Sequence, residues 1–352
     1  MATTEPVDRS PESAEDQKRR LRHGLISVAL LVALVAGLVL AVPGLHGVAT
    51  QLGHMNGGLI AIGVVLEILS CFGYVLTFML VFDRAPLLFA ARVAWTEMAF
   101  GAAVALGGAG SLGIGAWLLT QRGAPLGRVA QRSAVLFLLT SAVNVITLAV
   151  FGLGEGIGVF GGPSNPLLTL LPAGVGIATL AFFLALPKIM DRRAGASEGR
   201  LAKILEGIAS SIRDTAHMLV TPDWRLVGAV AYLLCDIAVL WVCLDAAGHP
   251  LPFASVVLAY QIAYLSNIIP VPGNIGVLDA SLIGMLTLYG ANATSAAAAA
   301  VVYHAIALWI PSLIGTIAFV RLQRSAGQPV TLRPPKAERR RARRERPQRT
   351  DT

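Results

Sequence analysis

Long runs of apolar residues alternate with short polar segments along most of this chain. The long apolar runs cover residues 24–42, 57–82, 87–107, 133–152, 166–187, 226–246, 251–270 and 296–320. Each is close to the roughly 20 residues that an α-helix needs to cross a bilayer core. Shorter apolar runs at 111–121 and 274–290 follow breaks rich in Gly or Pro. The pattern therefore predicts an all-α fold, a polytopic transmembrane helical bundle.

The composition also indicates a chain that is solvated mostly by lipid. Hydrophobic residues make up 55% of the 352 positions and charged residues 14%, whereas soluble domains carry roughly 25% charged residues. Cys71, Cys235 and Cys243 lie inside apolar runs and follow no metal-ligand spacing, so we expect them to be packing residues. No catalytic motif or phosphate-binding loop is apparent. We expect no enzymatic activity, no metal and no cofactor.

The basic residues are confined to one set of segments. All 28 Lys and Arg residues fall in 1–22, 84–132, 188–225 or 321–349, and the segments 43–56, 153–165, 247–253 and 291–295 contain none. Cytoplasmic loops of membrane proteins are enriched in Lys and Arg. The distribution predicts a multi-pass protein of the bacterial cell (cytoplasmic) membrane with both termini in the cytoplasm and the charge-free segments outside.

Composition divides the chain into three parts. Residues 1–22 are expected to form a disordered cytoplasmic N-terminus, residues 23–325 the transmembrane domain, and residues 326–352 a basic cytoplasmic tail. The net charge of +8 lies mainly in this tail and beside the apolar runs, which argues against nucleic acid as a partner. The tail either attracts anionic lipid head groups or is a solvated topology anchor.

The cytoplasmic segment 188–225 contains an amphipathic stretch. Its apolar residues follow helical spacing, with basic residues between them: Leu201, Ile204, Leu205, Ile208, Ile212 and Leu219 alternate with Arg200, Lys203 and Arg213. Such a helix either lies on the inner membrane surface or packs on the protein's own cytoplasmic face. The sequence leaves both interpretations open.

Two Gly-rich breaks occupy corresponding positions in two halves, about 57–152 and about 226–320. The first break includes Gly110 and Gly113, and the second includes Pro270, Pro272, Gly273, Asn274 and Gly276. A hairpin around the first break, about 87–122, starts and ends beside basic residues. The hairpin around the second, about 254–290, starts and ends in charge-free sequence. The pattern predicts an inverted repeat with two broken or re-entrant helical hairpins, an arrangement typical of transporters.

Ionisable residues also interrupt the apolar runs. Glu67, Glu97, Asp236, Asp279 and His304 lie in or near predicted spans, where a charged group costs about 2.5–3.5 kcal/mol on insertion scales. Such residues usually face the interior of a bundle and mark a pathway, although each could also be a buried hydrogen-bonding partner. As a set they favour a polar cavity.

The second break resembles a known family. Residues 270–280, PVPGNIGVLDA, are similar to the P-x-P-G-G-x-G-x-x-E-A signature of the lysylphosphatidylglycerol synthase transmembrane-region family, and Tyr303-His304 with the downstream Trp309-Ile310-Pro311 resembles its last span. The resemblance implies the flippase-like membrane part of that family without its soluble synthase domain. Asn274 replaces a usual Gly, Asp279 a Glu and His304 an Arg, and the last change removes a permanent cation.

These features together predict a transporter, most simply a flippase that moves a polar lipid or lipid-linked head group across the membrane. The expected transport residues are Pro270, Pro272, Gly273, Asn274, Gly276, Asp279, His304, Gly110, Gly113, Glu67, Glu97 and Asp236. The alternative is a non-transporting scaffold that docks a cytoplasmic lipid- or envelope-modifying enzyme. Membrane lipids are the expected partners. The sequence does not decide whether the protein forms a homo-oligomer.

Overall fold

The computed structural model describes residues 43–83, 85–103, 108–162, 165–195, 200–221, 223–264 and 275–324. The chain divides into two compact units, Met1–His54 and Met55–Thr352. In the first unit the described element is helix α2 (Pro43–His54), in a segment that the sequence analysis treats as a loop. Its first residue is Pro43, and proline suits the first position of a helix because the N–H that it lacks has no partner there. The predicted first span, 24–42, lies outside the described residues.

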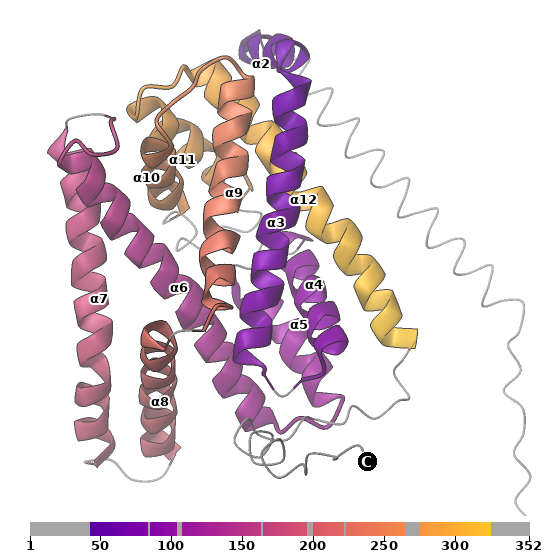
Figure 1. Cartoon of the computed structure of the whole chain (residues 1–352), viewed down its shortest axis with the longest axis vertical. Coiled ribbons are helices and arrows are strands. Elements are labelled where there is room, and N and C mark those ends of the chain that lie inside the picture. Colours follow the sequence, from indigo (N-terminus) through magenta and orange to yellow (C-terminus); the bar gives the residue numbers. More distant parts are fainter. Residues whose placement is uncertain are drawn as a thin grey trace, which may run out of the picture. The chain divides into compact units, whose positions relative to one another are not determined.

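The second unit consists of helices. They are α3 (Gly57–Val81), α4 (Leu87–Ala103), α5 (Gly108–Thr120), α6 (Leu126–Gly156), α7 (Pro166–Gly195), α8 (Arg200–Val220), α9 (Leu226–Ala246), α10 (Phe253–Tyr264), α11 (Ile275–Leu288) and α12 (Ala293–Arg324) (Figure 1). Every regular element among the described residues is helical. The prediction of an all-α fold is confirmed.

Five of these helices are long and apolar enough to cross a membrane: α3, α6, α7, α9 and α12. The shortest of them, α9, has 21 residues, which corresponds to about 31 Å at 1.5 Å per residue and matches the bilayer core. Large apolar side chains on these helices are exposed, among them Phe72, Phe182 and Leu313. The exposed apolar surface is what a lipid-facing bundle requires, so the chain is a multi-pass membrane protein.

Two of the predicted long runs form shorter helices. The run 87–107 contains α4, with 17 residues, and the run 251–270 contains α10, with 12 residues. At 1.5 Å per residue α10 is only about 18 Å long, too short to cross the bilayer core by itself. The described part of the predicted run 251–270 forms α10 up to Tyr264, and residues 265–270 lie outside the described residues. The length of this span therefore stays a prediction.

Both ends of the α4–α5 pair lie near residues that anchor the ends of other helices. Arg122, directly after α5, donates from Nη2 to the backbone oxygen of Leu322 near the end of α12, at 3.0 Å. Arg225, directly before α9, donates from Nη1 to the backbone oxygen of Met79 near the end of α3, at 3.0 Å. The start of α4 follows α3 after a short turn. Both ends of the pair therefore lie beside the ends of α3 and α12 and the start of α9.

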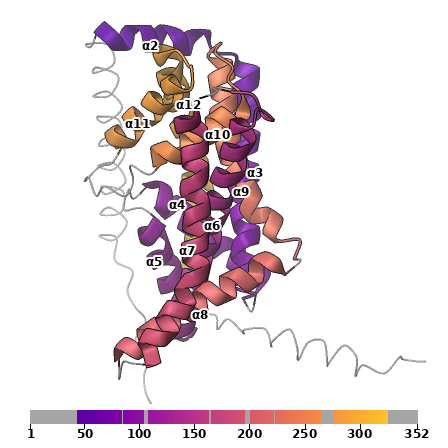
Figure 2. The ribbon, with the colours of Figure 1, turned by 90° about the vertical axis from the view of Figure 1, so that its left-hand side faces the viewer.

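The two ends of the α10–α11 pair lie at the other end of this unit, beside the start of α3 and the end of α9. The backbone N–H of Asn56, before α3, donates to the oxygen of Ala246 at the end of α9, at 3.1 Å. The ring of His249, between α9 and α10, forms a 3.2 Å hydrogen bond with the oxygen of Gly290, which follows α11. Figures 1 and 2 show α4 and α5 in the lower half of this unit and α10 and α11 in the upper half.

Helix α8 packs on the ends of its neighbours α6 and α7. The amide of Gln131 in α6 donates to Ser210 in α8 at 3.2 Å, and Arg213 of α8 forms a 2.7 Å ion pair with Asp191 of α7. The apolar face of α8 is buried at Ala209 and Ile212. Of the two interpretations that the sequence leaves open, these contacts favour packing on the protein's own helices.

Candidate functional site

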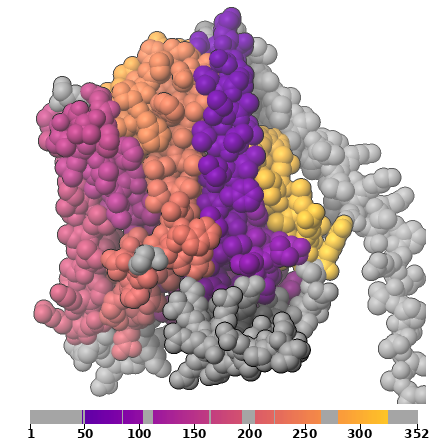
Figure 3. All heavy atoms as spheres, viewed as in Figure 1, coloured from indigo at the N-terminus to yellow at the C-terminus, as the bar shows by residue number. Residues whose placement is uncertain are grey.

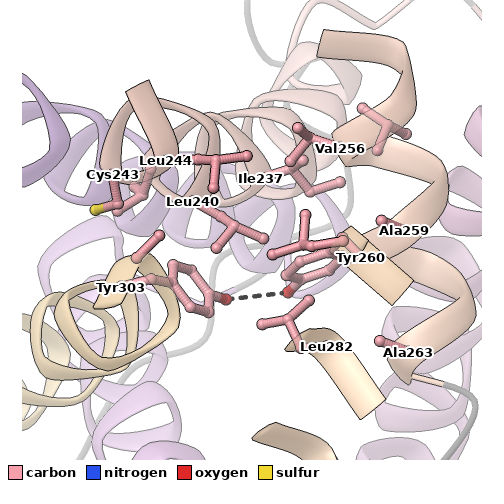
Figure 4. Close-up of a cluster of buried hydrophobic side chains, with 14 of the residues drawn as sticks. Ile237, Leu240, Cys243, Leu244, Val256, Ala259, Tyr260, Ala263, Leu282 and Tyr303 are labelled. Carbon is pink, nitrogen blue, oxygen red and sulfur yellow. Dashed lines mark hydrogen bonds between the residues drawn. The ribbon is translucent and has the colours of Figure 1, made fainter. Parts of the chain in front are cut away.

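A carboxylate and three tyrosines meet where α9, α10 and α12 come together. The Tyr260 hydroxyl donates to Oδ2 of Asp236, and the Tyr303 hydroxyl lies 3.1 Å from both carboxylate oxygens. The Tyr303 hydroxyl also forms a hydrogen bond with the Tyr260 hydroxyl, drawn as a dashed line in Figure 4, at 3.3 Å. It lies 3.4 Å from the hydroxyl of Tyr264. Asp236 is partly exposed, although it lies at the middle of a spanning helix.

A second carboxyl group faces this cluster from α3. Glu67 is 5% exposed. Its Oε1 accepts a 3.5 Å hydrogen bond from the Cys71 thiol, and Oε2 has no hydrogen-bond partner among the described residues. The charges of Glu67 and Asp236 interact across the α3–α9 interface. Two carboxylates at membrane depth repel each other and lack the hydration of bulk water, so the pair favours binding a proton or another cation.

A third carboxyl group lies in the α4–α5 pair. Glu97 of α4 is 1% exposed, and its Oε2 accepts a 2.7 Å hydrogen bond from the hydroxyl of Tyr74 in α3. Its Oε1 has no partner among the described residues and fills the place of a side chain at Gly115 in α5, where an added Cβ would lie 1.5 Å from it. Glu97 therefore joins α3, α4 and α5 at one buried point.

An aromatic contact connects Glu97 to the Asp236 cluster. The rings of Tyr74 in α3 and Tyr232 in α9 have centroids 5.1 Å apart, and Tyr232 precedes Asp236 by one helical turn. Ser70 of α3 donates to the Tyr232 backbone oxygen at 2.7 Å in the same interface. A continuous set of polar and aromatic groups thus runs from the α4–α5 pair to the α10–α11 pair through the α3–α9 interface.

Glu155 is a buried carboxyl group that the sequence analysis assigns to an outer loop. It lies in the last turn of α6, is 4% exposed and accepts a hydrogen bond from the Ser255 hydroxyl at the start of α10. Its other oxygen, Oε2, has no partner among the described residues. The contact fastens the α10–α11 pair to α6 near the end that lacks Lys and Arg in the described part of the chain.

Of the residues predicted from sequence, the structure brings Glu67, Asp236 and His304 together and links Glu97 to them. The His304 ring lies 4.9 Å from the ring of Tyr303. Gly113 lies in α5 beside open space. Gly110 is in α5, and Gly276 and Asp279 are in α11, but the side chain of Asp279 lies outside the described part. Pro270, Pro272, Gly273 and Asn274 also lie outside it.

The tyrosines of the cluster were not among the predicted site residues. Tyr260 and Tyr264 are one helical turn apart and stack at 4.2 Å between ring centroids, and Tyr303 is 1% exposed. A signal was present, because hydroxyl groups at helical spacing inside an apolar run need a partner when buried. The structure shows that Asp236 is the group that accepts the hydrogen bonds of Tyr260 and Tyr303.

The basic end of the α3–α9 interface is held by an ion pair outside the spanning segments. Arg225 donates to both carboxylate oxygens of Asp223, from Nε at 3.0 Å and from Nη2 at 2.7 Å. These hydrogen bonds raise the pKa of the Arg225 guanidinium above its ordinary value, and burial opposes the shift. Arg225 is therefore a permanently charged anchor for the start of α9.

Among the described residues, five helices long and apolar enough to cross a membrane and a cluster of carboxyl groups between them define a multi-pass α-helical membrane protein. A family model described as the lysylphosphatidylglycerol synthase transmembrane region matches residues 24–315. The chain belongs to this family, which confirms the resemblance found at residues 270–280. A comparison with curated proteins found no match.

Proposed function

We propose that this protein is a flippase that moves a polar lipid or lipid-linked head group across the cytoplasmic membrane. The observation that carries the proposal is the cluster of Asp236, the tyrosines that bond it and the neighbouring Glu67, between two pairs of short helices. Membrane proteins rarely place carboxyl groups at this depth unless they line a pathway or bind a partner. Asp236 is also partly exposed, as a pathway residue must be.

In this proposal the two short-helix pairs are re-entrant hairpins of an inverted repeat. The α4–α5 pair would enter from the cytoplasm and the α10–α11 pair from outside, with α3 and α9 as the equivalent preceding helices. Glu67 and Asp236 fit this equivalence, because each is residue 11 of its helix.

The topology follows the positive-inside rule in the same proposal. The end with Arg122 and Arg225 would face the cytoplasm, together with both chain termini. The acyl chains of the lipid would stay in the bilayer, while Asp236, Glu67 and His304 offer polar groups to the head group.

Translocation in proteoliposomes tests the proposal. The full chain would be reconstituted with fluorescent lipids of several head-group classes, anionic, zwitterionic and aminoacylated, and a membrane-impermeant quencher would report the outer leaflet. We expect faster exchange between leaflets than in protein-free vesicles for at least one class. Exchange equal to that of protein-free vesicles in every class would contradict the proposal.

A further inference from the structure

The buried carboxyl groups of the two helix pairs share one arrangement. In the first pair, a tyrosine of the spanning helix α3 bonds a carboxylate of the short helix α4, Tyr74 to Glu97. In the second, a tyrosine of the short helix α10 bonds a carboxylate of the spanning helix α9, Tyr260 to Asp236. Each helix pair is thus fastened to its neighbouring span by one carboxyl–tyrosine hydrogen bond, with donor and acceptor exchanged between the halves.

Glu97 has the features of a site that holds a removable proton. It is 1% exposed, its hydrogen-bond donor is neutral, and Oε1 has no partner among the described residues. A buried ionised carboxylate is costly unless it is paired with a cation. Tyr74 is the titratable group that faces it from α3, and α5 presents Gly115. Uptake of one proton by Glu97 removes the charge without moving a cationic side chain.

The second site combines Asp236 with Glu67. Two neighbouring carboxyl groups share protons rather than titrate independently. The titratable groups that face this pair are Cys71 of α3, Tyr232 and Cys235 of α9, Tyr260 and Tyr264 of α10, and Tyr303 and His304 of α12. The 5.1 Å contact between the rings of Tyr74 and Tyr232 joins this site to Glu97.

From this geometry we propose that Glu97 and the Glu67–Asp236 pair are two proton-binding sites, one for each helix pair, on a path through the α3–α9 interface. Each site takes up a proton from one aqueous phase, loses one negative charge and releases the proton to the other phase. Because the carboxyl–tyrosine bonds hold both helix pairs to their spans, proton binding and release would favour different positions of the pairs. Coupling of these positions to lipid movement rests on the proposed function, but proton binding itself does not.

Infrared difference spectroscopy on the reconstituted full chain tests the sites directly, because the C=O stretch of a protonated carboxyl group disappears on ionisation. Spectra would be compared between mildly acidic and mildly alkaline pH. We expect titrating carboxyl bands of buried groups, with one lost in Glu97→Gln and another in Asp236→Asn. Glu206→Gln changes an exposed residue of α8 and should leave these bands unchanged. Tyr74→Phe should shift the Glu97 band without removing it.

The outcomes separate this inference from the proposed function. Bands that titrate and vanish in the named variants support proton sites even if no lipid moves, a result that would count against the flippase alone. The inference would be overturned if the wild type showed no titrating band of a buried carboxyl group. It would also be overturned if Glu97→Gln and Asp236→Asn kept all the titrating bands of the wild type. If lipid does move, an imposed pH gradient should change its rate in the wild type and not in Glu97→Gln. A wild-type rate of lipid movement that does not change with the pH gradient would contradict coupling between proton binding and lipid movement.

Discussion

Gly73 in α3 and Gly228 in α9 lie so close together that neither helix has room for a side chain there. A Cβ added at Gly73 would lie 2.6 Å from the backbone oxygen of Gly228, and one added at Gly228 would lie 2.7 Å from that of Gly73. Small residues permit this close approach of helices in membranes. The contact keeps α3 and α9 side by side (Figures 1 and 3) and so brings Glu67 towards Asp236.

Replacing either glycine should therefore separate the two central helices. We expect Gly73→Ala to destabilise the protein by about 1–3 kcal/mol, because an extra methyl group overpacks the interface. Thermal unfolding in detergent would measure the effect. Gly284→Ala in α11 is a matched control, since nothing lies within 4 Å of its added Cβ. Equal unfolding temperatures for Gly73→Ala and the wild type would show that α3 and α9 do not pack as described.

The hydroxyl of Tyr303 is expected to stabilise the ionised carboxylate of Asp236 by hydrogen bonding. Tyr303→Phe keeps the ring but removes the donor that bonds Oδ1, and a hydrogen bond to a charged group contributes about 1.5–3 kcal/mol. The loss should appear as a lower unfolding temperature and slower lipid translocation. Tyr264→Phe should have a smaller effect, because its hydroxyl contacts Tyr303 at 3.4 Å. A larger effect of Tyr264→Phe would argue against this order of contacts.

Arg225 should not be replaceable by lysine. A lysine offers no planar fork and cannot keep the two bonds to Asp223 together with the third to the Met79 oxygen. Hydrogen bonds to charged groups contribute about 1.5–3 kcal/mol each, so Arg225→Lys should lower the unfolding temperature. Arg213→Lys is the control, because its ion pair is about half exposed and exposed pairs contribute about 0–1 kcal/mol. Equal losses in the two variants would contradict the anchoring role of Arg225.

The pH dependence of this anchor follows from the raised pKa of Arg225. A base whose pKa is higher in the folded state contributes stability below its unfolded pKa and loses it as pH rises through the folded pKa. Because the ordinary pKa of arginine is already very high, the contribution should stay constant from neutral to mildly alkaline pH. Unfolding temperatures of the wild type and Arg225→Lys, measured along this pH series, should differ by a constant amount. A difference that shrinks with rising pH would contradict this assignment.

The sequence predicts the spanning helices well where an apolar run has polar residues at both ends. The predicted run 226–246 coincides with α9, and the predicted start of α7 at residue 166 is exact. Charged residues that interrupt such runs also predicted burial, because Glu67 and Glu97 are both nearly inaccessible. Hydropathy specifies which segments enter the membrane, and the cost of burying charge specifies which groups face inward.

The partners of those groups could not be predicted in the same way. The bond between Tyr74 and Glu97 depends on how α3 packs against α4, and the cluster around Asp236 on how three helices meet. Helix α2 was missed because a short segment without charge gives no periodic signal long enough to indicate a helix. Glu155 was assigned to a loop because α6 extends beyond the apolar run that predicted it.

The central claim is that a head-group pathway passes the Asp236 cluster. Its most direct test is the rate of lipid exchange between leaflets in proteoliposomes containing the wild type, Asp236→Asn or Glu206→Gln at equal protein density. The account predicts that the wild type and Glu206→Gln exchange lipid at the same elevated rate, and that Asp236→Asn loses most of the increase while remaining folded. Exchange by folded Asp236→Asn at the wild-type rate would contradict it.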